Sequence, residues 1–347
     1  MAQQPLRIGF IGAGAIVRQR HVPGLRKLPD VELYGVVNRS AASSEHAAQE
    51  FGITRTYAST EEMLSDPKID AIWIGTQPYM HSKLTIAALD AGKHVFCQAR
   101  MAMDVADAKR MRERADASDR TVMICPPPHY MEGDRLMRRL MHEGFLGDFR
   151  SMLVRSYNNT FANPQKPLHW REIGAISGVN TMDVGMMSEV TARWVGNAKR
   201  LVAQAVTTFP SRPTETGATS TVDRPDTVSV VAEMERGGLG TFMFSTVVHH
   251  GTPNFIELYG SKGTIKYHMG ADHIMAGMAD AQKLERMAIP KNEWRDWTVE
   301  QDFVEAVRSG NRRPEPSVEE GLAYMMFTQA VDTSAMSGRA VVLSSLV

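Results

Sequence analysis

Gly12 and Gly14 follow a short apolar run of strand length directly and precede a helical pattern that begins at Ala15. Gly12 lets the chain turn tightly, and Gly14 has no Cβ, so a pyrophosphate can approach the backbone closely. The amides that open the helix, at Ala15 and Ile16, would face that phosphate with the positive end of the helix dipole behind them. The sequence therefore predicts a dinucleotide-binding turn, although Val17 occupies the place of a third glycine. A tight strand-to-helix turn without a ligand is the alternative.

The end of the second predicted strand, residues 31–37, bears on which dinucleotide would bind. It is followed by Asn38, Arg39 and Ser40. An acidic residue at this point would bind the 2′-hydroxyl of NAD, whereas an arginine with small polar neighbours suits the 2′-phosphate of NADP. Because the tripeptide has no acid, we expect NADP, with NAD as the second choice. The alternative is that Arg39 is only a solvated charge.

The elements that must position these residues alternate along the first part of the chain. Apolar runs at 6–11, 31–37, 69–75, 94–97 and 121–125 are separated by helical patterns, which predicts a doubly wound parallel sheet. Ligands of such sheets bind beyond the carboxyl ends of the strands. The residues near those ends that we expect to contact a cofactor, besides those named above, are Thr76, Gln77, Pro78, His81 and Gln98.

A run of three prolines at 126–128 separates this region from a different pattern. We therefore predict a nucleotide-binding domain over residues 1–126 and a second domain for substrate binding and oligomerisation over 127–347. Alternating strands are expected in the second domain at 150–157, 201–207, 227–235, 239–248, 254–259 and 264–268, with helices at 134–143, 181–195, 298–309 and 317–337. The fold class is α/β, with an open, mostly antiparallel sheet in the second domain.

Composition excludes several classes of protein. The 347 residues contain 39 basic and 39 acidic side chains, so no charge excess favours nucleic acid as a partner. No apolar run reaches the length of a membrane span, and the first strand begins too early for a signal peptide. The two cysteines, Cys97 and Cys125, suggest no disulfide framework, and no spacing of ligating residues predicts a metal site. A cytoplasmic location is expected.

The order of the motifs resembles the Gfo/Idh/MocA family of glucose–fructose oxidoreductase, inositol dehydrogenase and their relatives. The segments that carry the resemblance are IGFIGAGAIVRQRHVPGL, DAIWIGTQPYMH, AGKHVFCQARMAM, SGVNTMDVGMM, IELYGSKGTI and DFVEAVRSG. The resemblance implies an N-terminal Rossmann domain, a nicotinamide cofactor and a sugar, polyol or related hydroxyl or carbonyl substrate. It also implies a homodimer or homotetramer that packs through the open face of the C-terminal sheet.

The resemblance also locates candidates for catalysis. The family's usual lysine, in the motif E-K-P, corresponds to Ala99, and its usual histidine, four residues after an aspartate, corresponds to Met187. Neither alanine nor methionine can exchange a proton. The aspartate is retained as Asp183. The catalytic candidates are therefore Asp183, Arg100, His129 and His169.

Two classes of function remain open at this point. The first is an NADP-dependent oxidoreductase whose proton relay is rebuilt around Asp183. The second keeps the fold and the nucleotide but has no net redox turnover: a lyase, hydrolase or isomerase, or a non-catalytic sensor or partner subunit. The loss of both the lysine and the histidine motivates the second class.

Overall fold

The computed structural model describes residues 4–125, 131–251 and 254–346 of the chain. Two units divide the chain between them. The first contains residues 1–126 and 298–322, and the second contains residues 127–297 and 323–347. The chain thus returns to the first unit at 298–322, a segment that the sequence analysis placed in the C-terminal domain.

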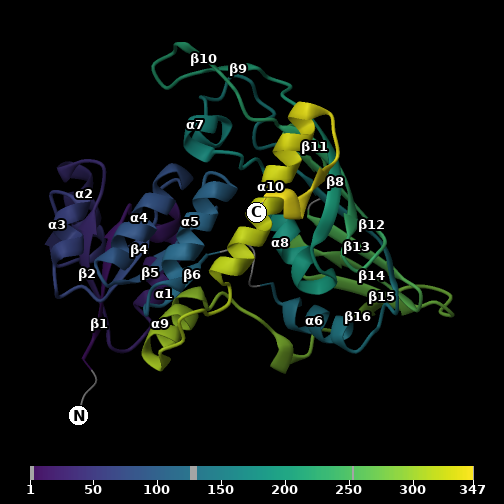
Figure 1. Ribbon diagram of the computed structural model, residues 1–347, viewed down its shortest axis with the longest axis horizontal. Helices are drawn as coiled ribbons and strands as arrows, with labels where there is room; N and C mark the ends of the chain where they lie inside the picture. Colours follow the sequence, from purple (N-terminus) through teal and green to yellow (C-terminus); the bar gives the residue numbers. More distant parts are fainter. Residues whose placement is uncertain (1–3, 126–130, 252–253, 347) are drawn as a thin grey trace. The chain divides into compact units, whose positions relative to one another are not determined.

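A six-stranded sheet in which all neighbouring strands are parallel forms the centre of the first unit (Figure 1). Its order is β3-β2-β1-β4-β5-β6, so the strands run outward in both directions from β1 and β4. The strands are β1 (Leu6–Ile11), β2 (Val31–Val37), β3 (Arg55–Thr56), β4 (Ala71–Ile74), β5 (His94–Cys97) and β6 (Val122–Ile124). The doubly wound parallel sheet is confirmed, and right-handed crossovers in both directions place helices on both of its faces.

The helices of the first unit connect these strands. They are η1 (Val17–His21), α1 (Val22–Leu25), α2 (Ala41–Phe51), α3 (Thr60–Ser65), α4 (Pro78–Asp90), α5 (Val105–Asp116) and α9 (Val299–Ser309). The chain from Ala15 to Leu25 is helical throughout, with the π-helical turn η1 in its middle.

Helix α9 joins the first unit because its apolar side packs on that unit's sheet. Phe303 is fully buried, and its ring lies 5.6 Å from the ring of Trp73 on β4 and 5.7 Å from that of Phe96 on β5, in edge-on geometry. Edge-on aromatic pairs add to the stabilisation that burial provides. Sequence order alone had assigned this helix to the C-terminal range, because its packing partners lie about two hundred residues earlier.

The second unit is built on a nine-stranded sheet of order β16-β15-β14-β13-β7-β12-β11-β8-β17. All of its neighbours are antiparallel except β7 and β12, so the predicted open, mostly antiparallel sheet is confirmed. Its strands are β7 (Phe149–Tyr157), β8 (Ala198–Val206), β11 (Thr227–Met234), β12 (Leu239–Ser245), β13 (Phe255–Gly260), β14 (Gly263–His268), β15 (His273–Met278), β16 (Glu285–Met287) and β17 (Val341–Val342). A separate two-stranded ribbon pairs β9 (Ser211–Pro213) with β10 (Thr219–Thr221).

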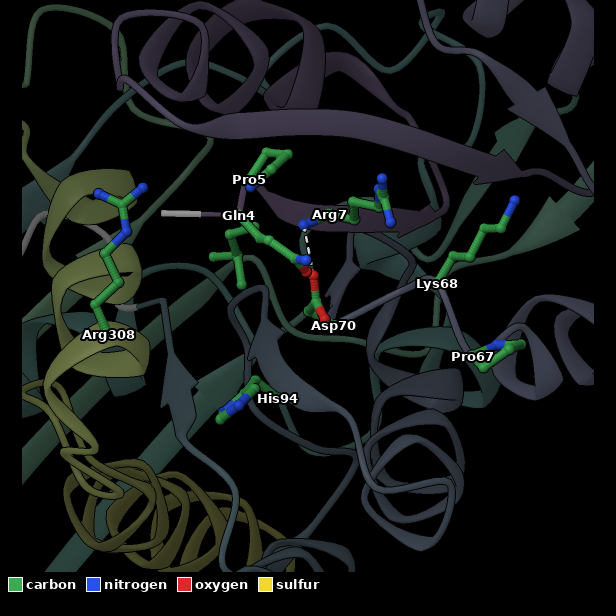
Figure 2. Close-up of a pocket in the computed structure, with 9 residues that line it drawn as sticks. Gln4, Pro5, Arg7, Pro67, Lys68, Asp70, His94 and Arg308 are labelled. Atoms are coloured by element: carbon green, nitrogen blue, oxygen red, sulfur yellow. Dashed lines mark hydrogen bonds between the residues drawn. The ribbon is translucent and has the colours of Figure 1, made fainter. Parts of the chain in front are cut away.

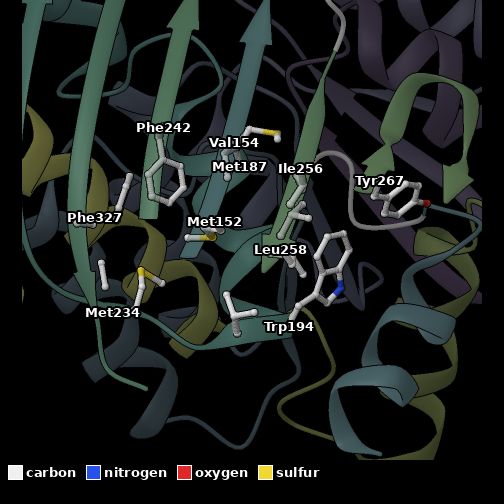
Figure 3. Packing of buried hydrophobic residues seen from close by; sticks show 14 of the residues in the cluster. Met152, Val154, Met187, Trp194, Met234, Phe242, Ile256, Leu258, Tyr267 and Phe327 are labelled. Atoms are coloured by element: carbon white, nitrogen blue, oxygen red, sulfur yellow. The ribbon is translucent and has the colours of Figure 1, made fainter. Parts of the chain in front are cut away.

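Helices contribute apolar side chains to one buried core on this sheet (Figure 3). They are α6 (Asp134–His142), α8 (Val184–Val195) and α10 (Val318–Ser337); the short helices η2 (Trp170–Glu172), α7 (Gly174–Ser177), η3 (Met269–Ala271), η4 (Lys291–Glu293) and η5 (Leu343–Leu346) lie in connections and at the C-terminal end. Helix α10 begins with a capping box, in which Ser317 Oγ accepts from the Glu320 amide and the Glu320 carboxylate accepts from the Ser317 amide.

Strand alternation shows which side of this sheet the core covers. Val228 and Val230 of β11 are 1% exposed and lie in the core, whereas the next residue, Val231, is 50% exposed. Val202 and Leu239 on the neighbouring strands are exposed as well. We call the side that carries Val202, Val231 and Leu239 the open face.

Candidate functional site

The glycine turn after β1 is fitted against the end of β4. Gly12 has φ +81°, and a Cβ at this position would lie 2.8 Å from Thr76 Cγ2, so both conformation and space require glycine. Gly14 differs, because the one atom that its Cβ would find within 4 Å among the described residues is the Gly75 carbonyl oxygen, at 4.0 Å. Gly12 therefore serves the turn itself, and Gly14 keeps an exposed surface open at the carboxyl edge of the sheet.

Val17 at the place of the third glycine is accommodated by a glycine opposite it. Val17 is fully buried, and a Cβ on Gly75 would lie 2.6 Å from Val17 Cγ2. Gly75 thus provides the close approach between helix and strand that a third glycine would otherwise provide. Ala15 is exposed and Ile16 half-buried where the helix begins, in the position expected for a phosphate site.

Asn38, at the end of β2, holds the glycine turn in place. Its Oδ1 accepts a hydrogen bond of 2.7 Å from the Ala13 amide, and its Nδ2 donates to the Ser43 carbonyl oxygen. Ser40 caps α2, since its Oγ accepts from the Ser43 amide. Asn38 and Ser40 are thus committed to the fold, while the side chain of Arg39 is exposed beside them.

The residues after β4 include one orphaned polar atom and one fully engaged histidine. Thr76 Oγ1 is buried and has no hydrogen-bond partner in the described part of the chain. His81 is buried, with Nδ1 2.7 Å from the Arg100 carbonyl oxygen and Nε2 2.9 Å from the Thr76 carbonyl oxygen, and its burial lowers its pKa. His81 ties the loops after β4 and β5 together, and both of its nitrogens are engaged by the chain. Gln77 is exposed, and Pro78 is the first residue of α4.

Gln98, which follows β5, belongs to a buried polar group that the sequence analysis did not foresee. Its Oε1 lies 2.8 Å from Nε2 of His21, and Nδ1 of His21 lies 2.5 Å from Oε1 of Glu300 on α9. His21 was quoted in the motif after the glycine turn, but Glu300 gave no local signal because its partner is 279 residues away. Ala99 and Arg100 follow Gln98 and are half-buried.

In the second unit, Asp183 lies next to the polar side chain of Ser156 on β7, and Asn254, just before β13, lies beside the same serine. Asp183 occupies the N-cap position of α8 but accepts no capping hydrogen bond from the helix. Its Oδ2 instead accepts a hydrogen bond of 2.8 Å from Ser156 Oγ on β7, and that hydroxyl also lies 2.7 Å from Oδ1 of Asn254. Ser156 is buried, and Asp183 is half-buried.

Of the other catalytic candidates, His169 lies in the same unit. Its Nδ1 accepts from the Arg171 amide, so in the neutral ring the proton is on Nε2. Burial, with the nearby Arg171 guanidinium, lowers the pKa of His169, so the ring is neutral at pH 7. His129 lies outside the described residues.

Met187, at the position where the resemblance puts a histidine, is part of the core. It is fully buried among apolar side chains of the sheet and of α8 (Figure 3). Cys97 and Cys125 are also fully buried, and burial raises the pKa of the Cys97 thiol to about 12. Neither cysteine is therefore a nucleophile at neutral pH. The described residues contain no cluster of three or more His, Cys, Asp or Glu side chains suited to a metal ion.

A cavity of about 410 Å³ lies at the opposite, amino-terminal edge of the first sheet (Figure 2). Its charged lining residues are largely occupied: Arg7 pairs with Glu32, and Arg308 donates to the carbonyl oxygens of residues 29 and 30. Lys68 and Arg308 lie on opposite sides of it in Figure 2. Ligands of parallel sheets bind at the other edge, so this cavity is not the candidate site.

Comparison with known proteins agrees with this geometry. Residues 6–125 match the sequence model described as "Oxidoreductase family, NAD-binding Rossmann fold", and residues 135–266 match that of the "GFO/IDH/MocA C-terminal domain". The chain belongs to the Gfo/Idh/MocA family of oxidoreductases. The nucleotide half of that assignment coincides with the glycine turn and the parallel sheet described above.

Several known proteins are similar to this one over nearly the whole chain. A myo-inositol 2-dehydrogenase of Thermotoga maritima is 25% identical, covering 99% of this chain and 100% of its own. An uncharacterized oxidoreductase of Rhizobium meliloti is 26% identical over 96% of this chain and 98% of its own. The solved structure of a levoglucosan dehydrogenase in complex with NADH and levoglucosan has a TM-score of 0.86 and 21% identity, and the match covers 98% of this chain and 100% of the other.

None of the helices in the described part of the chain has the length and apolar character needed to cross a membrane.

Proposed function

We propose that this protein is an NADP-dependent oxidoreductase that acts on a sugar, a polyol or a related cyclic hydroxyl or carbonyl compound. Its family is one of oxidoreductases, and the relatives named above include dehydrogenases of myo-inositol and of levoglucosan. The single observation that carries the proposal is the carboxyl edge of the first sheet, where Gly14 and the start of a helix are open to a phosphate. A bound nicotinamide would supply the hydride chemistry there.

The preference for NADP rests on the end of β2. No acidic side chain is present among residues 38–40, and Arg39 is the exposed cation at the start of α2. A 2′-phosphate would gain a charge-assisted hydrogen bond from Arg39 and the favourable end of the α2 dipole. The solved levoglucosan dehydrogenase complex contains NADH, so a direct comparison of the two nucleotides decides the preference of this protein.

Titration of both nucleotides into the wild-type protein and into Arg39→Ala tests this preference. A lost charge-assisted hydrogen bond predicts NADP affinity lower by roughly 10- to 150-fold in the variant, with NAD affinity unchanged. Arg26→Ala, an exposed arginine elsewhere in the same unit, is the charge control. Equal affinities for NAD and NADP, unaffected by Arg39→Ala, would remove the argument.

For the proton that accompanies hydride transfer, we propose Asp183. Its carboxylate is held by the Ser156 hydroxyl instead of being used to cap α8, and it is half-buried and therefore partly accessible. His169, neutral at pH 7, and His129 are proposed to assist, and Arg100 to orient an oxygen of the substrate. Arg100 is a poor proton carrier because a guanidinium does not deprotonate in this range.

Asp183→Asn keeps the shape and the hydrogen bond acceptor but removes the site for a proton. General acid–base help is worth about 10²–10⁴ in rate, so turnover should fall by that factor while nucleotide affinity persists. Asp148→Asn, an exposed acid in the same unit, should leave turnover unchanged. A screen of sugars and polyols by NADPH absorbance provides the substrate, and wild-type turnover in Asp183→Asn would refute the assignment.

Two observations favour a second candidate, a protein that keeps the nucleotide without net redox turnover. Ala99 and Met187 stand where the resemblance expects proton-exchanging residues, and Met187 is buried in the core. A lyase, hydrolase or isomerase, or a non-catalytic sensor, would bind nucleotide tightly and give no net change in its absorbance with any compound of the screen.

We further propose a homodimer or homotetramer that packs through the open face. Val202, Val231 and Leu239 expose 44%, 50% and 50% of their surface there, and large apolar faces are rarely left in water.

We also propose a cytoplasmic location for the protein, since both cysteines are free thiols.

A further inference from the structure

Another cavity, of about 390 Å³, lies in the second unit beside the first residues of β8. Because β17 pairs with β8 and η5 follows at once, residues 341–346 lie next to β8 (Figure 1). The apolar lining of the cavity consists of Ala198, Ala323, Met326 and Leu343. Ala323 and Met326 are three residues apart on α10 and therefore lie on one face of that helix. The cavity thus has apolar walls from α10, β8 and η5.

A β-bulge interrupts β8 where the strand borders this cavity. Met234 of β11 pairs with Ala198, and the preceding residue of β11 pairs with Arg200, so Lys199 is an extra residue without a partner on β11. Bulges of this kind change the direction of a side chain and are common beside binding sites. The extra residue is one of those that line the cavity. The bulge therefore supplies the cavity with a lysine that the regular pairing of the sheet does not require.

Four polar side chains line the same cavity, and the fold uses none of them. They belong to Asn197, Lys199, Glu235 and Ser344, and all four residues are exposed. Within the described residues, these side chains make no hydrogen bond and no ion pair. The cavity at the amino-terminal edge of the first sheet differs, because its arginines are engaged by the chain. The polar groups of this second cavity are therefore available to a ligand.

The lining indicates the chemical class of that ligand. Small-molecule sites are typically about 300–1,000 Å³ in volume and are mostly apolar, with a few polar groups that orient the ligand. Lys199 offers a cation to a carboxylate, and Glu235 offers a carboxylate to an ammonium group. Met326 and Leu343 offer apolar surface to an aliphatic side chain. A free apolar amino acid carries these three features in one small molecule.

We propose that this cavity binds a small zwitterion with an apolar side chain, of the class of free apolar amino acids. Lys199 binds its carboxylate, Glu235 binds its ammonium group, and the apolar walls receive its side chain. None of the residues that line the cavity belongs to the nucleotide edge or to the catalytic candidates. The proposal is therefore independent of the proposed oxidoreductase activity, and its test requires neither nucleotide nor turnover.

Methyl spectra of the full-length protein labelled with carbon-13 at its methionine methyl groups test binding directly, because Met326 lines the cavity. Met326→Leu assigns the signal. Titration with L-leucine should shift this signal in a saturable way and leave that of Met111, which is buried in the first unit, unchanged. A Met326 signal that does not respond to L-leucine up to its solubility limit would overturn the proposal.

Two analogues of L-leucine that each lack one charged group test the two ends of the ligand. They are 4-methylpentanoate, which lacks the ammonium group, and 3-methylbutylamine, which lacks the carboxylate. Exposed ion pairs contribute modestly, so each analogue should bind about two- to fivefold more weakly than L-leucine. Glu235→Gln should abolish the preference over 4-methylpentanoate, and Lys199→Gln should abolish the preference over 3-methylbutylamine.

Matched controls use an exposed ion pair elsewhere in the same unit. Lys283→Gln and Glu285→Gln should keep both preferences of the wild type. Ala323→Leu should fill the cavity and abolish the response of Met326 to L-leucine. Preferences that persist in both Lys199→Gln and Glu235→Gln would refute the assigned contacts, and this result decides the proposal even if Ala323→Leu does not fold.

Discussion

Replacing Met187 by histidine would test whether the second unit tolerates the residue that the resemblance expects there. Met187 is fully buried in the core of that unit, among side chains such as Met152, Val154 and Ile256 (Figure 3). An imidazole at this position would have at least one polar nitrogen without a partner, at a cost of about 1–3 kcal/mol. The substitution would also remove part of the roughly 1.5–3 kcal/mol of stability that burial of a methionine side chain contributes.

These effects add to about 3 kcal/mol of lost stability for Met187→His. In a unit of this size, that corresponds to a fall in Tm of roughly 6–12 °C, measured by scanning calorimetry at pH 8. Met187→Leu conserves the volume and should cost less than about 1.5 kcal/mol. The buried imidazole resists protonation, so its folded-state pKa falls below the ordinary value of about 6.5. The unfolded chain then binds the extra proton, and the loss grows as the pH falls below about 6.5.

The reasoning is refuted if Met187→His is as stable as the wild type at pH 8 and gains stability below about pH 6.5. That outcome would mean that position 187 has polar partners and faces a site instead of the core. The expected outcome means that a histidine cannot be restored at 187 by a single exchange, because the surrounding side chains are packed for a thioether.

Three further predictions follow from the fold. Gly14→Ala should keep the wild-type Tm and lose nucleotide affinity. Gly75→Ala should instead lower Tm, because its Cβ would collide with the Gly12 carbonyl oxygen and would lie 2.6 Å from Cγ2 of the buried Val17. Equal Tm values for the two variants would contradict this prediction. Burial raises the pKa of Glu189 to about 7 although Arg193 lies 3.0 Å away. The folded protein therefore keeps this carboxyl protonated between pH 4.5 and 7, and the stability that the group contributes is lost as the pH rises through that window. In urea titrations, the free energy of unfolding should depend less on pH in Glu189→Gln than in the wild type. Val231→Asp should dissociate an oligomer formed through the open face, and light scattering that gives a monomer for the wild type at micromolar concentration would contradict that interface.

The parts of the fold that the sequence predicted well are those encoded locally. The strand before Gly12 and the buried run that forms β4 can be predicted from neighbouring residues, and both are present in the structure. Strands β15 and β16 were not predicted. The first contains Gly277 and two methionines instead of a clear alternation of apolar and polar residues, and the second has three residues.

The candidate site was predictable only in part, for a related reason. The cofactor edge follows from strand ends, which are local features. The burial of Met187 had a signal that was available: with Val184, Val190 and Trp194 it forms an apolar stripe at helical spacing, typical of a core-facing helix. The partnership of His21 with Glu300 had none, because it depends on where a distant helix returns to the first sheet.

That return has a consequence for the order in which the protein can form during synthesis. The ribosome delivers all six parallel strands of the first unit before residue 126, but the helix with Phe303 and Glu300 follows only after eight of the nine strands of the second unit's sheet have been made. Until then, the Trp73 and Phe96 rings lack an apolar cover, and His21 lacks its carboxylate. A fragment that ends at residue 126 should therefore fold poorly and tend to aggregate. A nucleotide-binding fragment that folds by itself would need residues 298–322 joined to it through a short flexible linker.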